Sequence, residues 1–305
     1  MSKKTLKQDV NLVALIERYG NENKCRDYLE ELRWPDDVTC PRCASTDISE
    51  IAARGQYHCL SCQYHFSVMS GTIFHDSHLP LWKWFLAAYM MIESKKGISA
   101  NQMKRTLNVS YKTAWYLCHR IRAAMTEINP KPLTEIVEAD ETWVGGVKKN
   151  IGHGYKGNKK IVGGVIQRGG NARLSVLEGL DRKTLHEFIN KHVSNDAEAI
   201  YTDEWPSYNG IGDSNTKHET VNHSQNEWVR GDVYTNSVEN VWSLLKRSIM
   251  GSYHKVSAKH LDAYLDELEW RFNNRENPYL FRDTLLKLIH SSNLEYKNLV
   301  VSSSQ

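Results

Sequence analysis

The sequence predicts a chain of three structural parts: a small cysteine-bearing domain, then a helical domain, then an α/β domain with a mixed sheet. Two Cys-x-x-Cys pairs lie in a segment too irregular for long helices, and residues 79–126 carry apolar residues at helical spacing. β-rich runs then follow the helix-breaking Pro130 and Pro132. At 305 residues the chain is long enough for two or three domains, one of them with a sizeable core.

The cysteine pairs predict a zinc ribbon. Cys40-Pro-Arg-Cys43 is followed by 15 residues and then by Cys59-Leu-Ser-Cys62, the spacing of two knuckles that hold one tetrahedral zinc ion. Four thiolates close the coordination shell, so the zinc is expected to be structural and to replace a core that so short a segment lacks. The alternative is two disulfides. It is disfavoured because MSKKTLKQDV has no apolar signal segment, and we therefore expect an intracellular protein with reduced thiols.

The helical segment is predicted to contain three helices, the first with one amphipathic face. Ser99 and Ser110 can cap the second and third helices, and Asn108 supplies the tight turn between them. Two helices joined in this way resemble a helix-turn-helix, whose second helix reads DNA. The alternative is an ordinary three-helix bundle with a basic surface.

The charge distribution points to nucleic acid, although the formal net charge is only +3. Residues 94–126, 142–177 and 240–261 each contain several Lys and Arg and no Asp or Glu. Such segments suit a polyanionic partner, whose bound counterions they release. The alternative for each is a solvated face. The candidate DNA-binding residues are Lys104, Arg105, Lys112, Arg120 and Arg122.

The α/β domain is predicted from its order of elements: three strands, a helix, a strand, a short strand near residues 218–222, and two final helices. Such an order suits a mixed sheet. The expected limits are a helical preface at 1–35, the zinc ribbon at 36–75, the helical DNA-binding domain at 76–128, the α/β domain at 133–290 and a tail at 291–305.

Three acidic residues in this domain form a candidate metal-dependent site. Asp140 lies within or at the end of the first strand, Asp203 ends a later strand, and Glu239 lies one turn into a helix, 35 residues (204–238) after Asp203. Carboxylates that converge can hold two divalent ions about 3.5–4 Å apart, the arrangement that attacks phosphodiesters. Singly each has another explanation: a surface strand residue, a turn residue, and a capping box with Asn236. Lys246 lies two turns beyond Glu239, where it could contact a phosphate.

These residues lie in stretches that resemble a known family. CPRC, CLSC, FSVMSGTIFHDSHLPLWKWFLAAYMM, VEADETWVGG, YTDEWPSY and TNSVENVWSLLKRSIMGSYHKVSAKHLDAYLDELEWRFNNR are similar to zinc-ribbon insertion-sequence transposases with an ISXO-type DDE catalytic domain. The resemblance covers about residues 25 to 285. It implies an RNase H-like fold in which Asp140, Asp203 and Glu239 bind the catalytic Mg²⁺ or Mn²⁺, and in which Lys246 is their basic companion.

The resemblance also implies partners and an activity. The expected DNA partners are terminal inverted repeats and target DNA, held by a homodimer or larger assembly, and the expected reaction is metal-dependent cleavage and strand transfer. The alternatives are an inactive DNA-binding regulator descended from such an enzyme, and a nuclease that cuts without joining. No apolar run reaches the roughly 18 residues of a membrane span, so we expect a cytoplasmic, nucleoid-associated protein. Roles for His218, His223 and Asn236 stay open.

Overall fold

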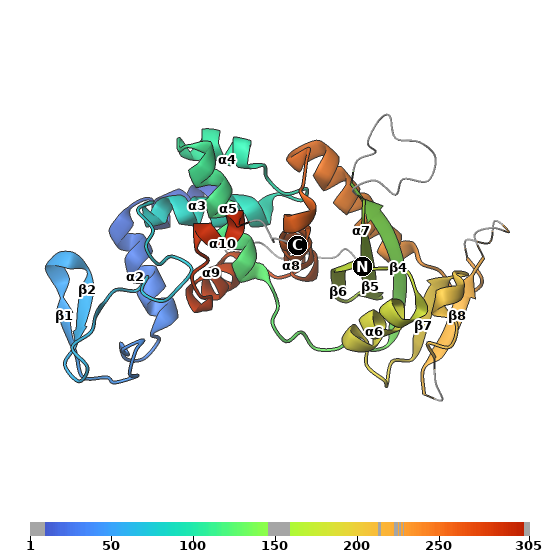
Figure 1. Cartoon of the computed structure of the whole chain (residues 1–305). Helices are drawn as coiled ribbons and strands as arrows, with labels where there is room; N and C mark the ends of the chain where they lie inside the picture. The colour runs from blue at the N-terminus through green and yellow to red at the C-terminus, as the bar shows by residue number, and fades with distance from the viewer. Residues whose placement is uncertain are drawn as a thin grey trace. The chain divides into compact units, whose positions relative to one another are not determined.

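The computed structural model describes residues 10–145, 159–212, 215–222, 225, 227 and 229–301, and it divides the chain into two compact units (Figure 1). One unit comprises the chain up to Met125 together with the segment from Glu276 onward, and the other is Thr126–Arg275. The second unit is thus inserted into the first. Among the described residues, every helix is too short or too polar to cross a lipid bilayer.

The first unit is built mainly of helices. The three predicted helices are present with both predicted serine caps: the Ser99 hydroxyl accepts from Gln102 N at 3.2 Å, and the Ser110 hydroxyl accepts from Thr113 N at 3.0 Å. Asn108 adopts the left-handed conformation that turns the chain between them (φ 50°). The helices are α1 (Leu12–Tyr19), α2 (Glu22–Arg33), α3 (Leu81–Glu93), α4 (Ala100–Leu107), α5 (Tyr111–Met125), α9 (Leu280–His290) and α10 (Tyr296–Val300).

The helix α9 lies in a different unit from the one expected. The sequence placed it in an α/β domain of residues 133–290, whereas it packs against α2, α3 and α5 of the first unit. The physical reason is aromatic packing: the Phe281 ring lies 5.9 Å from Phe85 and 6.1 Å from Tyr19, measured between ring centroids. The expected tail also contributes, because the Tyr116 hydroxyl donates to the carbonyl of Leu294 at 2.5 Å.

The ribbon is a small antiparallel sheet of β1 (Ile48–Ile51), β2 (Gln56–Cys59) and β3 (His65–Phe66). Its own core is limited to a few side chains, including Trp34, Tyr57 and Phe66, around buried Cys40 and Cys59. The chain after β3 is tied to α2 by Arg33, whose guanidinium donates to the carbonyls of residues 67, 68 and 70.

The second unit contains a five-stranded mixed sheet in the order β6-β5-β4-β7-β8. β4 pairs antiparallel with β5 and parallel with β7, so it is the central strand. This order and these directions are those of an RNase H-like domain, and the predicted fold class is confirmed. The strands are β4 (Ile136–Val144), β5 (Lys160–Gln167), β6 (Ala172–Leu177), β7 (Ala199–Asp203) and β8 (Lys217–Val221).

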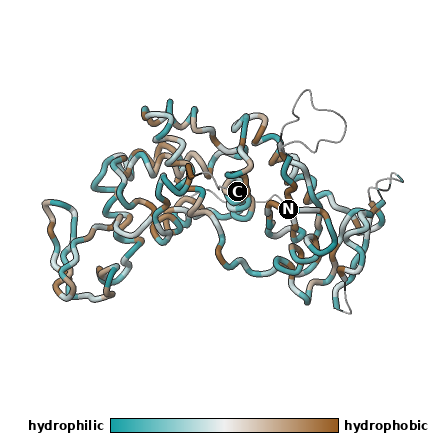
Figure 2. The backbone as a smooth tube through the Cα atoms, viewed as in Figure 1, coloured by the Kyte–Doolittle hydropathy of each residue, from teal (hydrophilic) through white to brown (hydrophobic). Residues whose placement is uncertain are grey.

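Helices cover both faces of this sheet. α6 (Arg182–His192) packs on one face through Leu185, Phe188 and Ile189, which join a core with strand residues of β4 and β5. α7 (Asn236–Ser248) and α8 (Leu261–Asn273) pack on the other face. Between these two helices the chain forms a π-helical turn, η4 (Ile249–Tyr253), and a short 3₁₀ turn, η5 (Ala258–His260). Figure 2 shows hydrophobic stretches along the central strands, as two covered faces require.

Two adjacent glycines in β5 permit the close packing on both faces. A Cβ atom at Gly163 would lie 2.6 Å from the Leu177 side chain on the α6 face. A Cβ atom at Gly164 would lie 2.5 Å from the Trp242 ring on the α7 face. Because neighbouring residues of a strand point to opposite faces, the pair opens space for each helix in turn.

Candidate metal centre and acidic site

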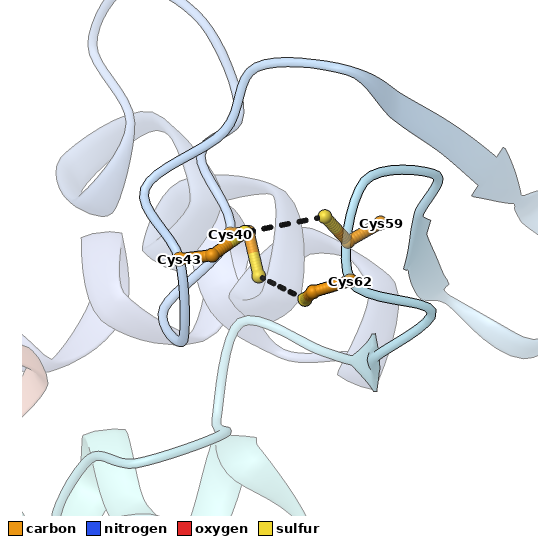
Figure 3. A group of neighbouring side chains, drawn as sticks. All are labelled: Cys40, Cys43, Cys59 and Cys62. Carbon is orange, nitrogen blue, oxygen red and sulfur yellow. Dashed lines mark hydrogen bonds between the residues drawn. The ribbon is translucent and has the colours of Figure 1, made fainter.

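The four predicted zinc ligands lie together in the ribbon (Figure 3). Their sulfur atoms all lie within 4.8 Å of one another, with Cys40 Sγ 3.7 Å from Cys62 Sγ and Cys43 Sγ 3.6 Å from Cys59 Sγ. Four sulfurs at about 2.3 Å from one tetrahedral zinc ion would lie roughly 3.8 Å apart, so the cluster has the geometry of such a site. All six cysteines of the chain are free thiols in this structure, and the four sulfurs of the cluster are spaced as for a shared ion rather than bonded in two disulfides.

Asp140 and Asp203 lie on adjacent strands and face the same side of the sheet. The parallel pairing of β4 with β7 places Glu138 opposite Tyr201. Two residues further along both strands stand Asp140 and Asp203, and residues two apart in a strand share a face. The proximity is also electrostatic, because the charge of Asp203 contributes to raising the pKa of Asp140.

Glu239 and Lys246 reach the same region from α7. A cleft of about 510 Å³ is lined by Asp140 from β4 and by Glu239, Trp242, Lys246 and Arg247 from α7, together with Met250 of the π-helical turn. Glu239, Lys246 and Arg247 are exposed there, while Trp242 is buried. The indole Nε1 of Trp242 donates to Asp140 Oδ2 at 2.8 Å and so joins the helix to the strand.

The three carboxylates are spread more widely than ligands of a single ion. Within the part of the chain that the structure describes, the cysteine cluster is the one group of metal-ligating atoms that all lie within 4.8 Å of one another. Asp203 is also absent from the residues that line the cleft. When two ions lie about 3.5–4 Å apart, each carboxylate needs to reach only one of them. The three carboxylates can therefore lie farther from one another than ligands of a single ion.

The site carries a concentration of negative charge. Burial, followed by the neighbouring charges of Glu141 and Asp203, raises the pKa of Asp140 to about 7, although the hydrogen bond from Trp242 acts to lower it. Burial likewise raises the pKa of Glu141. Glu141 follows Asp140 in β4, and its carboxylate accepts a hydrogen bond from the buried Tyr208 hydroxyl, which belongs to the core on the α6 face. That is the opposite face, as the strand alternation predicts.

Glu138 is a component of this region that the sequence did not reveal. Its side chain is fully buried, and it accepts from Ser237 N at 2.7 Å, from Val238 N at 3.2 Å and from Arg168 Nε at 2.8 Å. It therefore satisfies two backbone donors in the first turn of α7, those of its second and third residues. The alternative explanation of Glu239, a capping box with Asn236, does not hold, because Asn236 is itself the first residue of the helix and Thr235 is the N-cap.

His218, one of the two histidines singled out from the sequence, lies away from the acidic site. The Nε2 atom of His218 lies 3.0 Å from the Thr202 hydroxyl. Because Thr202 precedes Asp203 in β7, its side chain points to the other face of the sheet. His223 lies outside the described residues.

The candidate DNA-binding residues divide into two groups. Lys104 and Arg105 near the end of α4 and Lys112 near the start of α5 are exposed, and Lys112 Nζ lies 4.4 Å from the centre of the Tyr296 ring. Arg120 and Arg122, which were also predicted to bind DNA, are only 3% and 2% exposed, so their side chains are not available at the surface for such a contact.

Arg120 is buried together with acceptors inside the fold. Arg120 donates to the carbonyl of His75 at 2.7 Å and to the amide oxygen of Asn293 at 2.9 Å. Similarly, Arg168 and Arg173, from the second acid-free segment, pair with Glu138 and Glu269. Acid-free runs therefore overstate the basic surface, since the compensating acids come from other parts of the chain. Lys148, Lys149 and Lys156 of the second run lie outside the described residues.

Family models match two stretches of the chain. Residues 20–65 match the transposase zinc-ribbon domain, and residues 132–273 match the ISXO2-like transposase domain. The first stretch contains the four-cysteine cluster, and the second contains the mixed sheet together with α7 and α8.

Two curated proteins are similar in sequence. A protein in the transposable element ISH50 of Halobacterium salinarum is 27% identical over 276 residues, which cover 84% of this chain and 92% of that protein. A transposase-like protein of Haemophilus influenzae is 33% identical over 101 residues, which cover 33% of this chain and 80% of that protein.

Among solved structures, complexes of the Mos1 transposase show a weak likeness. The Mos1 strand transfer complex has a TM-score of 0.30 at 12% identity, over 67% of this chain and 74% of that chain. The Mos1 mariner paired-end complex with Mn also has a TM-score of 0.30 at 12% identity, over 90% and 88%. TM-scores this low do not support any inference about the residues of the acidic site.

Proposed function

The chain belongs to the family of ISXO2-like transposases with a zinc ribbon, and we propose that it acts as the DNA transposase of an insertion sequence. In this proposal it binds the ends of its element, cleaves a DNA strand there and joins the new end to target DNA. The observation that carries the proposal is the shared cleft of Asp140 and Glu239, which come from different elements, with Asp203 next to Asp140 on the same face.

The donor set fits Mg²⁺ or Mn²⁺. Asp140, Asp203 and Glu239 offer only carboxylate oxygens, the ligands that these hard cations prefer. Burial first, and then the charges of Glu141 and Asp203, raise the pKa of Asp140, and a cation at this position would stabilise its charged form. Two divalent ions held by the three side chains would activate the attacking oxygen and stabilise the leaving oxygen of a phosphodiester.

The remaining residues of the cleft orient these groups and the DNA. Trp242 fixes one oxygen of Asp140, whose residue lines the cleft. Lys246 and Arg247 are exposed at its wall, where they can neutralise the phosphate on either side of the scissile bond. Hydrolysis at the element's end exposes a 3′-hydroxyl, which then attacks target DNA. The second reaction exchanges one phosphodiester for another, so it needs no external energy source.

The first unit is proposed to recognise the element's end. The α4–turn–α5 pair has the arrangement of a helix-turn-helix, and Lys112 lies near the start of the second helix, where side chains reach base edges or phosphates. Lys104 and Arg105 would add phosphate contacts. The ribbon would be held by one structural Zn²⁺ on Cys40, Cys43, Cys59 and Cys62, since four thiolates leave no open position for chemistry.

The proposed partners follow from the same activity. The specific DNA would be the terminal inverted repeats, and a homodimer or larger assembly would bring two ends together before target DNA is joined. Such an enzyme would work in the cytoplasm, in association with the nucleoid.

The test compares two aspartates of the same domain. Asp203→Asn should abolish Mg²⁺-dependent nicking of end DNA and leave end binding within about twofold, because it removes a metal ligand without touching the first unit. Asp196→Asn, an exposed residue three positions before β7, is the matched control and should cleave normally.

Each other outcome favours a different activity. Cleavage retained by Asp203→Asn would refute the catalytic assignment. A wild-type chain that binds ends and cuts nothing in Mg²⁺ or Mn²⁺ would be an inactive regulator. A chain that cuts end DNA without joining it to a target plasmid would be a nuclease.

A further inference from the structure

Glu138 joins the two elements that carry Asp140 and Glu239. Its Oε2 atom accepts from Ser237 N at 2.7 Å and Val238 N at 3.2 Å, and its Oε1 atom accepts from the Ser237 hydroxyl at 3.0 Å. The residue is 0% exposed, so all these bonds form away from water. A buried carboxylate that accepts several hydrogen bonds is held in one orientation, because the loss of any donor would leave a charge unsatisfied.

The position of Glu138 couples this anchor to the acidic site. Glu138 stands two residues before Asp140 in β4, so both side chains face α7. Its acceptors hold the residues immediately before Glu239 in the first turn of that helix. A carboxylate at a helix N-terminus also complements the helix dipole. One side chain therefore fixes the strand that carries Asp140 to the helical turn that carries Glu239.

Arg168 completes the anchor from the end of β5. Its Nε atom donates to Glu138 Oε1 at 2.8 Å, and its other nitrogens donate to the carbonyls of Asp232 at 2.8 Å and Tyr234 at 3.0 Å. The guanidinium also lies 3.6 Å from the centre of the Tyr234 ring. The chain that leads into α7 is thus held by the same ion pair as the helix itself.

We propose that Glu138 is a positioning residue of the acidic site: through the N-terminus of α7 it sets the spacing between Asp140 and Glu239, and so determines how well the site binds divalent ions. The inference rests on the proposed function of that site. A purely structural Glu138 would stabilise the domain without affecting metal binding, and this difference makes the two roles separable.

The test uses Glu138→Gln, with Glu269→Gln as the matched control. Glu269 is a carboxylate with a 12% exposed side chain that likewise accepts from a backbone donor, Leu174 N at 2.9 Å, and pairs with an arginine, Arg173, at 3.4 Å. It joins α8 to β6 rather than α7 to β4. Both substitutions keep the shape of the side chain and remove its charge. Thermal melting establishes that each full-length variant is folded.

Two readouts separate positioning from structure. The first is Mn²⁺ binding, measured without DNA by calorimetry or by the spin resonance of free Mn²⁺. The second is the Mg²⁺ concentration that gives half-maximal cleavage of end DNA. Glu138→Gln should weaken Mn²⁺ binding and raise the Mg²⁺ requirement by about 10-fold, and lower saturated cleavage by about 100-fold, as displaced supporting groups do. Glu269→Gln should stay within about twofold of the wild type in both.

A Glu138→Gln variant that matches Glu269→Gln in Mn²⁺ affinity and Mg²⁺ requirement would overturn the inference. Should Glu138→Gln fail to fold, Ser237→Ala removes one hydrogen bond to Glu138 and keeps the rest, and it must shift both readouts in the same direction. A wild-type chain that binds Mn²⁺ and cuts no end DNA would refute the proposed function, while the Mn²⁺ comparison would still decide the role of Glu138. A wild-type chain that binds no Mn²⁺ would refute both.

Discussion

Gly164→Ala should disturb the acidic site indirectly, because the added methyl group displaces the Trp242 ring that contacts Asp140. A Cβ atom at Gly164 would lie 2.5 Å from Cη2 and 2.8 Å from Cζ2 of Trp242, and 3.1 Å from the Leu174 side chain. Ordinary van der Waals contact begins at about 3.4 Å, so the ring must move by about 1 Å. A rigid indole held in a packed core has no flexible end that could yield instead, and overpacking of this kind costs about 1–3 kcal/mol.

The displaced ring should also reduce activity. The hydrogen bond from Trp242 to Asp140 measures 2.8 Å, and a movement of about 1 Å would take it beyond normal hydrogen-bond length. Asp140 would then lose the donor that orients its carboxylate. A misplacement of about 1 Å at a reacting centre costs roughly 100-fold in rate, which is the loss of cleavage expected for Gly164→Ala.

Gly163→Ala is the matched control, because the same substitution in the same strand points to the other face. Its Cβ atom would lie 2.6 Å from a terminal methyl of Leu177 and 3.1 Å from the Phe188 ring. Urea unfolding should show that both variants lose stability. Single-turnover cleavage of end DNA should then separate them, with Gly163→Ala within about threefold of the wild type once it is folded. Equal cleavage by the two variants would refute the assignment of Trp242 to the orientation of Asp140.

Three further outcomes are expected. Burial raises the pKa of Glu269 to about 7, so the stability that protonated Glu269 contributes is fully present below the unfolded pKa near 4.5 and is lost as the pH rises through 7. The loss amounts to up to about 3 kcal/mol, so urea unfolding should show the stability of Glu269→Gln increasing relative to the wild type between pH 5 and 8. A difference in stability that stays constant with pH would contradict the shift. Cys43→Ser should reduce the amount of zinc bound per chain below the one ion expected for the wild type. A chromogenic chelator added to the denatured protein measures the released zinc, and an unchanged zinc content would exclude the cluster as the zinc site. Lys112→Ala should weaken binding to end DNA and reduce the magnitude of the slope of log affinity against log salt concentration by about 1. Filter binding at several salt concentrations measures this slope, and an unchanged slope would show that Lys112 does not contact a phosphate.

Local patterns predicted most of the fold. Ser99 and Ser110 cap their helices because a cap depends on residues within one turn, and such patterns are visible in the sequence. The sequence also placed Asp140 and Asp203 in two strands, and the parallel pairing of β4 with β7 puts those strands side by side. The placement of the cysteine cluster followed from its spacing alone.

What the sequence did not reveal depends on residues distant along the chain. Arg120 was assigned to the DNA surface because no acid lies near it, yet its acceptors are a carbonyl 45 residues earlier and a side chain 173 residues later. Glu138 stood in the quoted VEADE stretch, but its role depends on donors about 100 residues away. The one local indication of its role was its position two residues before Asp140, which places both side chains on the same face of the strand.

The packing of α9 against α2, α3 and α5 has a consequence for synthesis of the chain on the ribosome. In the order of translation, α9 follows the whole inserted unit, so the helices with the candidate DNA contacts cannot complete their core until that unit has emerged. A truncated product that ends before Glu276 would contain the complete acidic site together with a first unit that lacks α9. On the proposed function, premature termination would thus produce a chain with impaired recognition of its element's ends.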